Sequence, residues 1–180
     1  QRRKTNIYGM GPKPTTLEVN NLYEDEPINI IKNYTVTEKA EGEGKILYVL
    51  GVNHLDDEKK YRYRSLVGKA YLIDSRKIIY TGVDKLTNLS NLIINGEYMK
   101  HNKNNEFINR YLAYDLYYYN NYDVAIDLPL VNKGKGRIGL LKNKLKDFKI
   151  QETIKFDIKV KDFYVSNDSE DIFHLSKYVL

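Results

Sequence analysis

Four segments rich in Ile, Val, Tyr and Thr follow one another in the first half of the chain, separated only by short polar connections. They are INIIKNYTVT, KILYVLGV, YRYRSLVGKAYLI and KIIYTG, at residues 28–37, 45–52, 61–73 and 77–82. β-Branched and aromatic residues favour strands. Strands joined by such short connections must pair antiparallel, because a parallel return needs a crossover of a dozen or more residues. The sequence therefore predicts an antiparallel meander.

The last third of the chain carries the clearest strand pattern. In ETIKFDIKV, residues 152–160, large apolar side chains alternate with polar and charged ones: Ile154, Phe156, Ile158 and Val160. This alternation is typical of a strand with one buried and one solvated face. It slips by one residue near Asp162, which predicts a bulge or bend. The final IFHLSKYVL, residues 172–180, is interpreted as a last strand.

Between these regions the apolar residues change their spacing. Four of them fall three or four residues apart, which is helical spacing: Leu86, Leu89, Leu92 and Ile93. Asp84 can cap the start of such a helix and Gly96 can end it. A second helix starting at Asn105 suits the spacing of the following aromatic residues, although a strand suits them too. The predicted fold is thus an α+β domain, mainly antiparallel β (a meander sheet or partly open barrel), with a helical insertion around residues 84–118.

The composition indicates one folded domain preceded by an arm. Of 180 residues, 42% are hydrophobic and 29% charged, and a chain of this length can bury one substantial core. No apolar run reaches the roughly 18 residues needed to span a bilayer. Residues 1–27 carry several glycines and prolines and are predicted to form an irregular arm, and residues 28–180 to form a single β-rich domain. The sequence assigns no compartment.

A GxGxxG pattern formed by Gly134, Gly136 and Gly139 follows an apolar run. A dinucleotide site is disfavoured, because such glycines need an alternating strand and helix architecture and the preceding strands are predicted to be antiparallel. The segment is interpreted as a flexible turn or the entry to a short helix. A sharper alternative is an anion-contact loop within residues 132–146, since this segment holds six cations and no acid. These candidate contacts are Lys133, Lys135, Arg137, Lys142, Lys144 and Lys146.

Residues that carry catalysis are sparse. The chain has no cysteine, which removes thiol nucleophiles and cysteine metal sites, and its three histidines stand apart from other ligands. No metalloprotease or serine-hydrolase motif occurs, so no catalytic residue, metal or cofactor is predicted. An active site assembled from carboxylates distant in sequence stays open as a third hypothesis.

The leading functional hypothesis is therefore a non-enzymatic binding or structural module, a subunit of a larger protein assembly. The arm and a tyrosine-rich segment are its expected contacts, because tyrosine is enriched at interfaces. The candidate interface residues are Tyr117, Tyr118, Tyr119 and Tyr122. The alternative is a nucleic-acid or polyanion-binding domain that uses residues 132–146, which agrees with the net charge of +5.

Overall fold

The chain forms two compact units, which are described separately. The computed structural model describes residues 15–31, 34–53, 66–83, 86–87, 91–119, 122–132, 135–146, 155–167 and 170–179. The sheet unit contains the described residues within 41–160, and the terminal unit contains those within 11–40 and 161–180. The boundary between the units after residue 40 does not coincide with the predicted end of an arm at residue 27.

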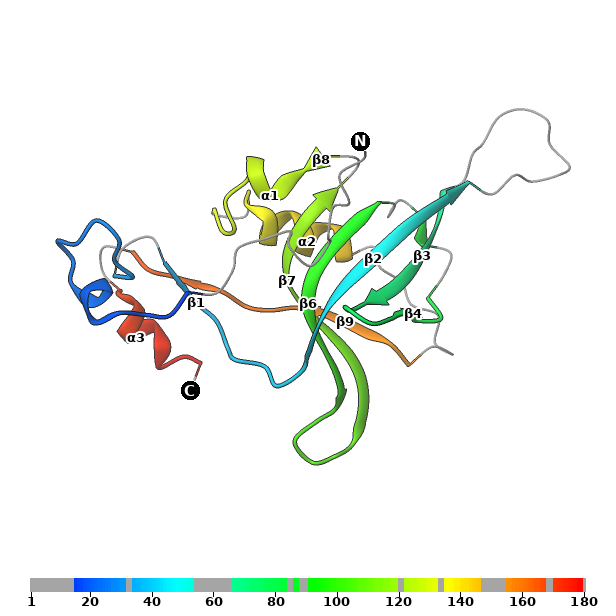
Figure 1. Cartoon of the computed structure of the whole chain (residues 1–180), viewed down its shortest axis with the longest axis horizontal. Helices are drawn as coiled ribbons and strands as arrows, with labels where there is room; N and C mark the ends of the chain where they lie inside the picture. The colour runs from blue at the N-terminus through cyan, green and yellow to red at the C-terminus, as the bar shows by residue number, and fades with distance from the viewer. Residues whose placement is uncertain are drawn as a thin grey trace, which may run out of the picture. The chain divides into compact units, whose positions relative to one another are not determined.

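One sheet organises the sheet unit (Figure 1). Its strands are β2 (Glu43–Asn53), β3 (Leu66–Ile73), β4 (Ile78–Tyr80), β5 (Leu86–Thr87), β6 (Leu92–His101), β7 (Phe107–Tyr119), β8 (Tyr122–Asp123) and β9 (Asp157–Val160). They are ordered β4, β3, β2, β6, β7 and β8, with β5 paired to β3 and β9 to β7. Only the β7–β9 pair is parallel among the described strands. The α+β class dominated by antiparallel strands is confirmed, and the described strands form an open sheet rather than a barrel.

The predicted meander is confirmed for β2, β3 and β4. These strands are neighbours in chain order, and both pairs are antiparallel. The turn between β3 and β4 is held by Asp74, whose carboxylate accepts hydrogen bonds from the backbone amides of Arg76 and Lys77. A side chain that satisfies nearby amides in this way fixes a tight turn. The polar DSRK connection is therefore a hairpin turn, as its composition predicts.

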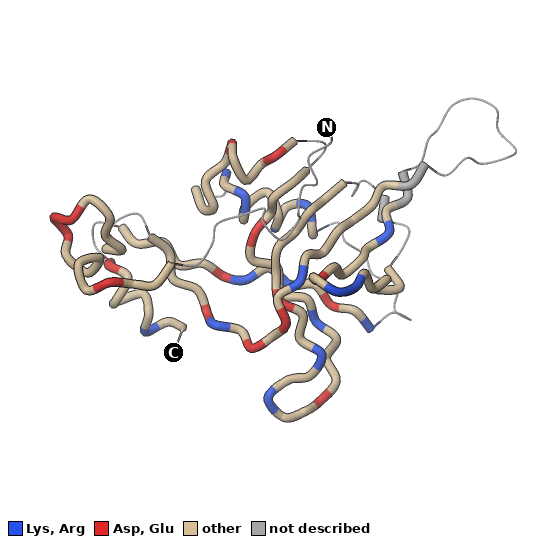
Figure 2. Tube along the Cα trace, viewed as in Figure 1, with Lys and Arg blue, Asp and Glu red and all other residues tan. Residues whose placement is uncertain are grey.

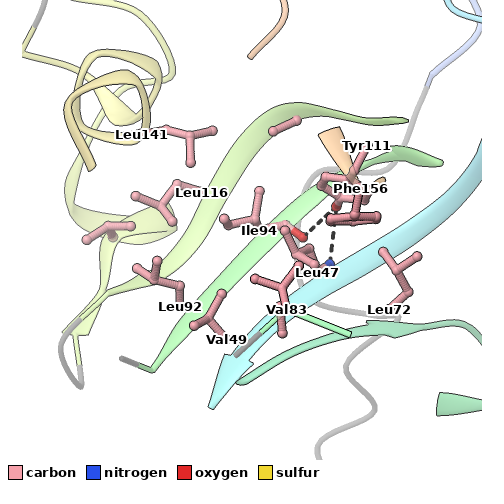
Figure 3. Packing of buried hydrophobic residues seen from close by; sticks show 13 residues of the cluster. Leu47, Val49, Leu72, Val83, Leu92, Ile94, Tyr111, Leu116, Leu141 and Phe156 are labelled. Atoms are coloured by element: carbon pink, nitrogen blue, oxygen red, sulfur yellow. Dashed lines mark hydrogen bonds between the residues drawn. The ribbon is translucent and has the colours of Figure 1, made fainter. Parts of the chain in front are cut away.

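The hydrophobic core lies on one face of the sheet, where side chains from four neighbouring strands meet (Figure 3). On β2, Leu47 and Val49 are fully buried, and each lies opposite one residue of β3 and one of β6. The other buried residues of this cluster are Ala70, Leu72, Val83, Leu92, Ile94, Tyr111, Ala113, Leu116, Val124, Leu141 and Phe156. Alternate residues of a strand share a face, so these positions form a continuous apolar layer.

The prediction of a helical insertion over residues 84–118 is wrong for the described residues, which form β5, β6 and β7. Leu92 and Ile94 are buried in the core, and the alternating residues Ile93 and Asn95 are only partly buried. Burial of every second residue is the pattern of a strand. Pairing of β6 with both β2 and β7 satisfies its backbone, and this tertiary pairing outweighs the helical spacing of the leucines. The β6–β7 register shifts three times, which marks bulges in this hairpin.

Tyr111 of β7 crosses Gly96 of β6 and reaches the backbone of β2. Its hydroxyl accepts a hydrogen bond from the Leu47 amide at 3.2 Å and lies 2.8 Å from the Lys45 carbonyl oxygen, to which it donates. A Cβ atom on Gly96 would lie 2.6 Å from the Tyr111 ring, so only glycine leaves room for this arrangement. Burial raises the pKa of Tyr111 well above its usual value, and the hydroxyl therefore stays protonated as a donor.

Two helices lie at the β7 side of the sheet unit. They are α1 (Val124–Asp127) and α2 (Arg137–Leu145). Each contributes one residue to the core cluster, Val124 from α1 and Leu141 from α2. Figure 3 shows Leu141 directed towards the sheet from α2. Of the two interpretations of the glycine pattern, a flexible turn or the entry to a short helix, the structure has the helix, which begins directly after Gly136.

The terminal unit combines segments from both sides of the sheet unit in the sequence. It contains the 3-10 helix η2 (Val19–Leu22), strands β1 (Thr35–Val36) and β10 (Tyr164–Val165), and helix α3 (Ile172–Ser176). β1 and β10 pair antiparallel, with Thr35 opposite Val165. The prediction of a final strand at residues 172–180 is wrong, because Asp171 caps a helix there by accepting a hydrogen bond from the His174 amide.

Candidate interaction surfaces

Gly136, the central glycine of the GxGxxG pattern, is buried against its own chain. A Cβ atom at this position would lie 2.7 Å from the Pro129 carbonyl oxygen and 2.8 Å from the Asn132 amide nitrogen. Gly139 lies inside α2, and Gly134 lies outside the described residues. The glycine at position 136 is thus required by the close approach of the loop that precedes it.

The same loop occupies the first backbone amides of α2. The Arg137 amide donates to the Pro129 carbonyl at 3.0 Å, and the Ile138 amide donates to the Leu130 carbonyl at 3.1 Å. A phosphate at a helix N-terminus needs such amides to be available. Here they already have protein acceptors, so this turn does not form a phosphate cradle from these two donors.

Arg137, one of the six candidate anion contacts, is buried and paired within the protein. Its Nε lies 2.7 Å from Asp115 Oδ1 and its Nη2 lies 3.0 Å from Asp115 Oδ2, which is a bidentate ion pair with β7. Its Nη1 donates to the carbonyl oxygens of Ala125 and Leu128 at the end of α1. The guanidinium therefore joins β7, α1 and α2, and its charge is neutralised internally.

The other candidate cations that the structure describes lie on or beside α2. Lys135, Lys142 and Lys146 are exposed, and Lys133 lies outside the described residues. The Lys144 ammonium lies 4.7 Å from the centre of the Tyr119 ring, a cation–π contact that ties α2 to β7. Three of the six predicted contacts are thus brought together as exposed cations on one short segment.

The tyrosine candidates differ sharply in exposure. Tyr117 is buried, and its hydroxyl oxygen accepts a hydrogen bond from Asn95 Nδ2 at 2.6 Å. Burial, followed by the negative charge of Asp115, raises the pKa of Tyr117 to about 12. Tyr118 and Tyr119 are partly buried. Tyr122 of β8 is 69% exposed and is the candidate that remains most accessible.

The elements β8, α1 and α2 are drawn near one another (Figure 1), and Arg137 of α2 donates to the Ala125 and Leu128 carbonyl oxygens. Ile126 of α1 is 81% exposed, and exposed Tyr122 precedes α1 directly. We define the basic corner as these two residues with the three exposed lysines of the α2 segment: Tyr122, Ile126, Lys135, Lys142 and Lys146. Such a mixture of large apolar and cationic residues suits a partner that offers apolar and acidic groups.

The terminal unit exposes most of its large hydrophobic residues. Among its described residues Leu175 is the only buried hydrophobic one, whereas ten large hydrophobic side chains are exposed. The ten are Leu17, Val19, Leu22, Tyr23, Ile28, Tyr34, Tyr164, Val165, Phe173 and Tyr178. Scattered apolar residues are normal on a protein surface, but this density without a matching core is not.

Several of these exposed side chains touch one another around α3. The rings of Tyr164 and Tyr178 stack with centroids 5.9 Å apart, and the His174 ring meets the Tyr178 ring edge-on at 5.9 Å. The Tyr178 hydroxyl donates to Glu170 Oε1 at 3.4 Å, and His174 Nε2 lies 3.7 Å from the same oxygen. The α3 cluster, made of these four residues, is thus an aromatic surface with a carboxylate at its rim.

A second surface of the terminal unit is an acidic loop at residues 23–28. Glu24, Asp25 and Glu26 are exposed, and exposed Tyr23 and Ile28 flank them. Asn29 Nδ2 donates to the Glu24 and Glu26 carbonyl oxygens, which holds the loop in one conformation. The loop therefore presents three carboxylates between two large apolar side chains.

The two units carry opposite net charge among their described residues (Figure 2). The terminal unit has eight carboxylates and three lysines, a formal net charge of −5. The sheet unit has fourteen Lys and Arg residues and nine carboxylates, a formal net charge of +5. The positive net charge of the whole chain thus does not indicate that one of its units is acidic.

No protein-family model and no curated protein sequence matches the chain. In the described part of the chain, no helix is long and apolar enough to cross a membrane. The described residues also contain no group of three or more His, Cys, Asp or Glu side chains that could hold a metal ion. The surfaces themselves must therefore support any functional proposal.

The sequence indicated the arm at residues 1–27 as a contact surface, but not the residues after 160 that join it in the terminal unit. Which side chains of this unit are exposed depends on the packing of the whole fold, and a short stretch of sequence does not determine that packing. One signal was available in the run Glu24–Asp25–Glu26, which is acidic in a basic chain and lies between Tyr23 and Ile28. A charge count of separate segments would have revealed it.

Proposed function

We propose that the chain is a non-enzymatic protein-binding module, a subunit of a larger assembly, and that the terminal unit supplies its main contact surface. The observation that carries this proposal is the ratio of ten exposed large hydrophobic residues to one buried hydrophobic residue in the described part of that unit. Small units bury a low fraction of their surface, so their stability is marginal and gains from further contacts. Covering its exposed apolar groups with a protein partner supplies the missing burial.

The composition of the surface supports a protein partner rather than a small molecule. Tyrosine and phenylalanine are enriched at protein interfaces, because they offer large contact areas at a low cost in conformational entropy. The α3 cluster combines stacked aromatic rings with a polar rim, which is the usual arrangement of an interface. The tyrosine-rich segment of β7 supports this role less, since Tyr117 is buried.

Photo-crosslinking tests this proposal directly. A photoreactive phenylalanine analogue is placed at position 173, and in a matched control at position 107, whose native side chain is 54% exposed against 52% for Phe173. In the cells that produce the chain, we expect a protein adduct from position 173 and little from position 107. Mass spectrometry identifies the adduct. Adducts in equal amounts from both positions, or none from position 173, would contradict the proposal.

The second candidate function is polyanion binding by the lysines of the α2 segment. It is favoured by exposed Lys135, Lys142 and Lys146, and by the lack of an acid among the described residues 135–146. Internal pairing of Arg137 weakens it. If it holds, replacing all three lysines by glutamate lowers the slope of log affinity against log salt by about 2 for a single-stranded oligonucleotide. An unchanged slope would exclude this site.

A further inference from the structure

We propose that the partner of the terminal unit is a second copy of this chain, whose basic corner receives the acidic loop of the first copy. This inference rests on the proposed function and names its partner. It assigns a specific contact: the loop at residues 23–28 of one copy docks against Tyr122, Ile126, Lys135, Lys142 and Lys146 of the next.

The two surfaces match in charge and in apolar content. The acidic loop carries three exposed carboxylates and two exposed apolar side chains. The basic corner carries three exposed lysines and two exposed apolar side chains, and exposed Asp127 follows Ile126, so its charge remains positive. Opposite charges that face each other across an interface guide association and exclude wrong partners. The apolar side chains supply the area that leaves water, from which most of the binding free energy comes.

Both surfaces are held in place before binding. Asn29 bonds the carbonyl oxygens of the acidic loop, and Asn21 Nδ2 donates to the Ile28 carbonyl at 2.9 Å. On the basic corner, Arg137 fixes α1 to α2 through the Ala125 and Leu128 carbonyls. Surfaces that need no ordering on contact keep more of their interaction energy as affinity.

A second copy is the favoured partner because one sequence encodes both complementary surfaces. The described parts of the two units carry formal charges of −5 and +5, so the acidic surface of one copy attracts the basic surface of another. A contact between different surfaces of identical chains is heterologous, and it generates a closed ring or an open filament depending on the rotation between copies. Association is therefore predicted to grow with concentration.

Salt dependence follows from the charges. The screening length falls from about 10 Å at 0.1 M salt to about 3 Å at 1 M. The attraction between exposed carboxylates and lysines weakens over this range. The weight-average molar mass measured in solution is therefore expected to decrease towards that of the monomer as the salt concentration rises.

The test is a charge swap followed by analytical ultracentrifugation of the full chain. One variant reverses the corner (K135E/K142E/K146E), and another reverses the loop (E24K/D25K/E26K). Each variant alone is expected to associate at least about a hundredfold more weakly than the wild type, because like charges then face each other. An equimolar mixture of the two is expected to regain association, since each acidic surface again finds a basic one. Circular dichroism verifies that both variants are folded.

A control variant reverses three exposed lysines elsewhere on the sheet unit, K69E/K100E/K103E. It changes the net charge as much as the corner variant does and should retain wild-type association. The proposal is overturned by a wild type that stays monomeric at every concentration, as it would if the surfaces met within one chain. It is equally overturned if the mixture stays monomeric or if the control loses association as the corner variant does.

The outcome separates this inference from the proposed function. If the wild type is monomeric and position 173 cross-links to a different protein, the proposal of self-association is wrong and the proposal of a binding module stands. If the wild type is monomeric and position 173 gives no cross-link, both proposals are wrong. Cross-links from position 173 to this chain itself, together with recovery in the mixture, support both.

Discussion

At the scale of single residues, two glycines of neighbouring strands differ in what surrounds them. A Cβ atom on Gly96 would lie 2.6 Å from both the Leu112 carbonyl oxygen and the Tyr111 ring, whereas one on Gly44 would meet nothing within 4 Å. We expect Gly96→Ala to lower the free energy of unfolding by roughly 1–3 kcal/mol through overpacking. Gly44→Ala is the control and should change stability by less than about 1 kcal/mol. Urea denaturation measures both, and equal stability of the two variants would refute the packing described for Tyr111.

A second residue-scale prediction concerns acid. The Asp74 carboxylate accepts hydrogen bonds from Lys45 Nζ at 2.7 Å and from the amides of Arg76 and Lys77. These bonds, the one from Lys45 foremost, lower the pKa of Asp74 to about 2.

The sign of the effect on stability follows from that shift. The unfolded chain has a higher pKa for this carboxyl, about 3.9, so the unfolded state binds the proton first. The stabilisation is present above about pH 4 and is lost as the pH falls towards 2. Asp74→Asn should therefore flatten the dependence of the thermal midpoint on pH between about 4 and 2. A dependence as steep as that of the wild type in this range would count against the assignment.

At the scale of elements, the segments with the period of a strand were predictable and the ambiguous middle was not. The composition of β2, β3 and β4 and their short connections predicted both their strand character and their pairing. β6 was misassigned because Leu86, Leu89 and Leu92 have helical spacing, while its partner β2 lies far away in sequence. Pairing between distant strands is set by the whole sheet, and a local window does not contain it.

The entry to helix α2 was one of two interpretations of the glycine pattern, the other being a flexible turn, and the charges of the segment were interpreted without their partners. Nothing near Arg137 in sequence indicates that Asp115, on a strand, would neutralise it. The exposed lysines of the same segment need no such information, because solvent is the default environment of a lysine. The local sequence therefore identified the basic segment at residues 132–146, but it did not indicate that Arg137 is paired with Asp115 inside the protein.

The ion pair of Arg137 yields a prediction about how the elements are joined. Arg137→Met leaves Asp115 buried without its counter-ion and frees two carbonyl oxygens of α1, so we expect a loss of roughly 3–5 kcal/mol in the free energy of unfolding. The matched control is Arg110→Met, which breaks a more exposed pair whose Nε lies 2.7 Å from Asp157 Oδ2. Its cost should be about 0–1 kcal/mol. Denaturant unfolding compares the two variants, and similar losses would argue against a special role for Arg137.

At the scale of the whole molecule, average composition concealed the organisation. A net charge of +5 describes neither unit, and the expectation of one domain after residue 27 did not anticipate that residues from both sides of the sheet unit would join. Composition sums over the chain, whereas the fold sorts residues into separate groups. The net charge of the whole chain therefore conceals the acidic surface, although the local run Glu24–Asp25–Glu26 indicates it.

The two units predict separate responses to core truncation. Leu175 is the buried hydrophobic residue described in the terminal unit, and Leu141 belongs to the core of the sheet unit. We expect Leu175→Ala to speed amide hydrogen exchange within residues 161–179 and to leave β2 and β6 protected. Leu141→Ala, the counterpart, should speed exchange in α2 and β7. Faster exchange in β2 and β6 caused by Leu175→Ala would mean that the units unfold as one.

The pairing of β1 with β10 has a consequence for the order in which the molecule is made. Synthesis proceeds from the N-terminus, so Thr35 leaves the ribosome before the strands of the sheet unit, and its partner Val165 leaves after them. The stacked rings of Tyr164 and Tyr178 are translated later than every strand of the sheet unit. A nascent chain halted before residue 164 thus has the strands of a sheet but no aromatic cluster around α3. The α3 cluster is therefore completed only after the sheet has been synthesised, so a partner that needs this cluster cannot bind an unfinished chain.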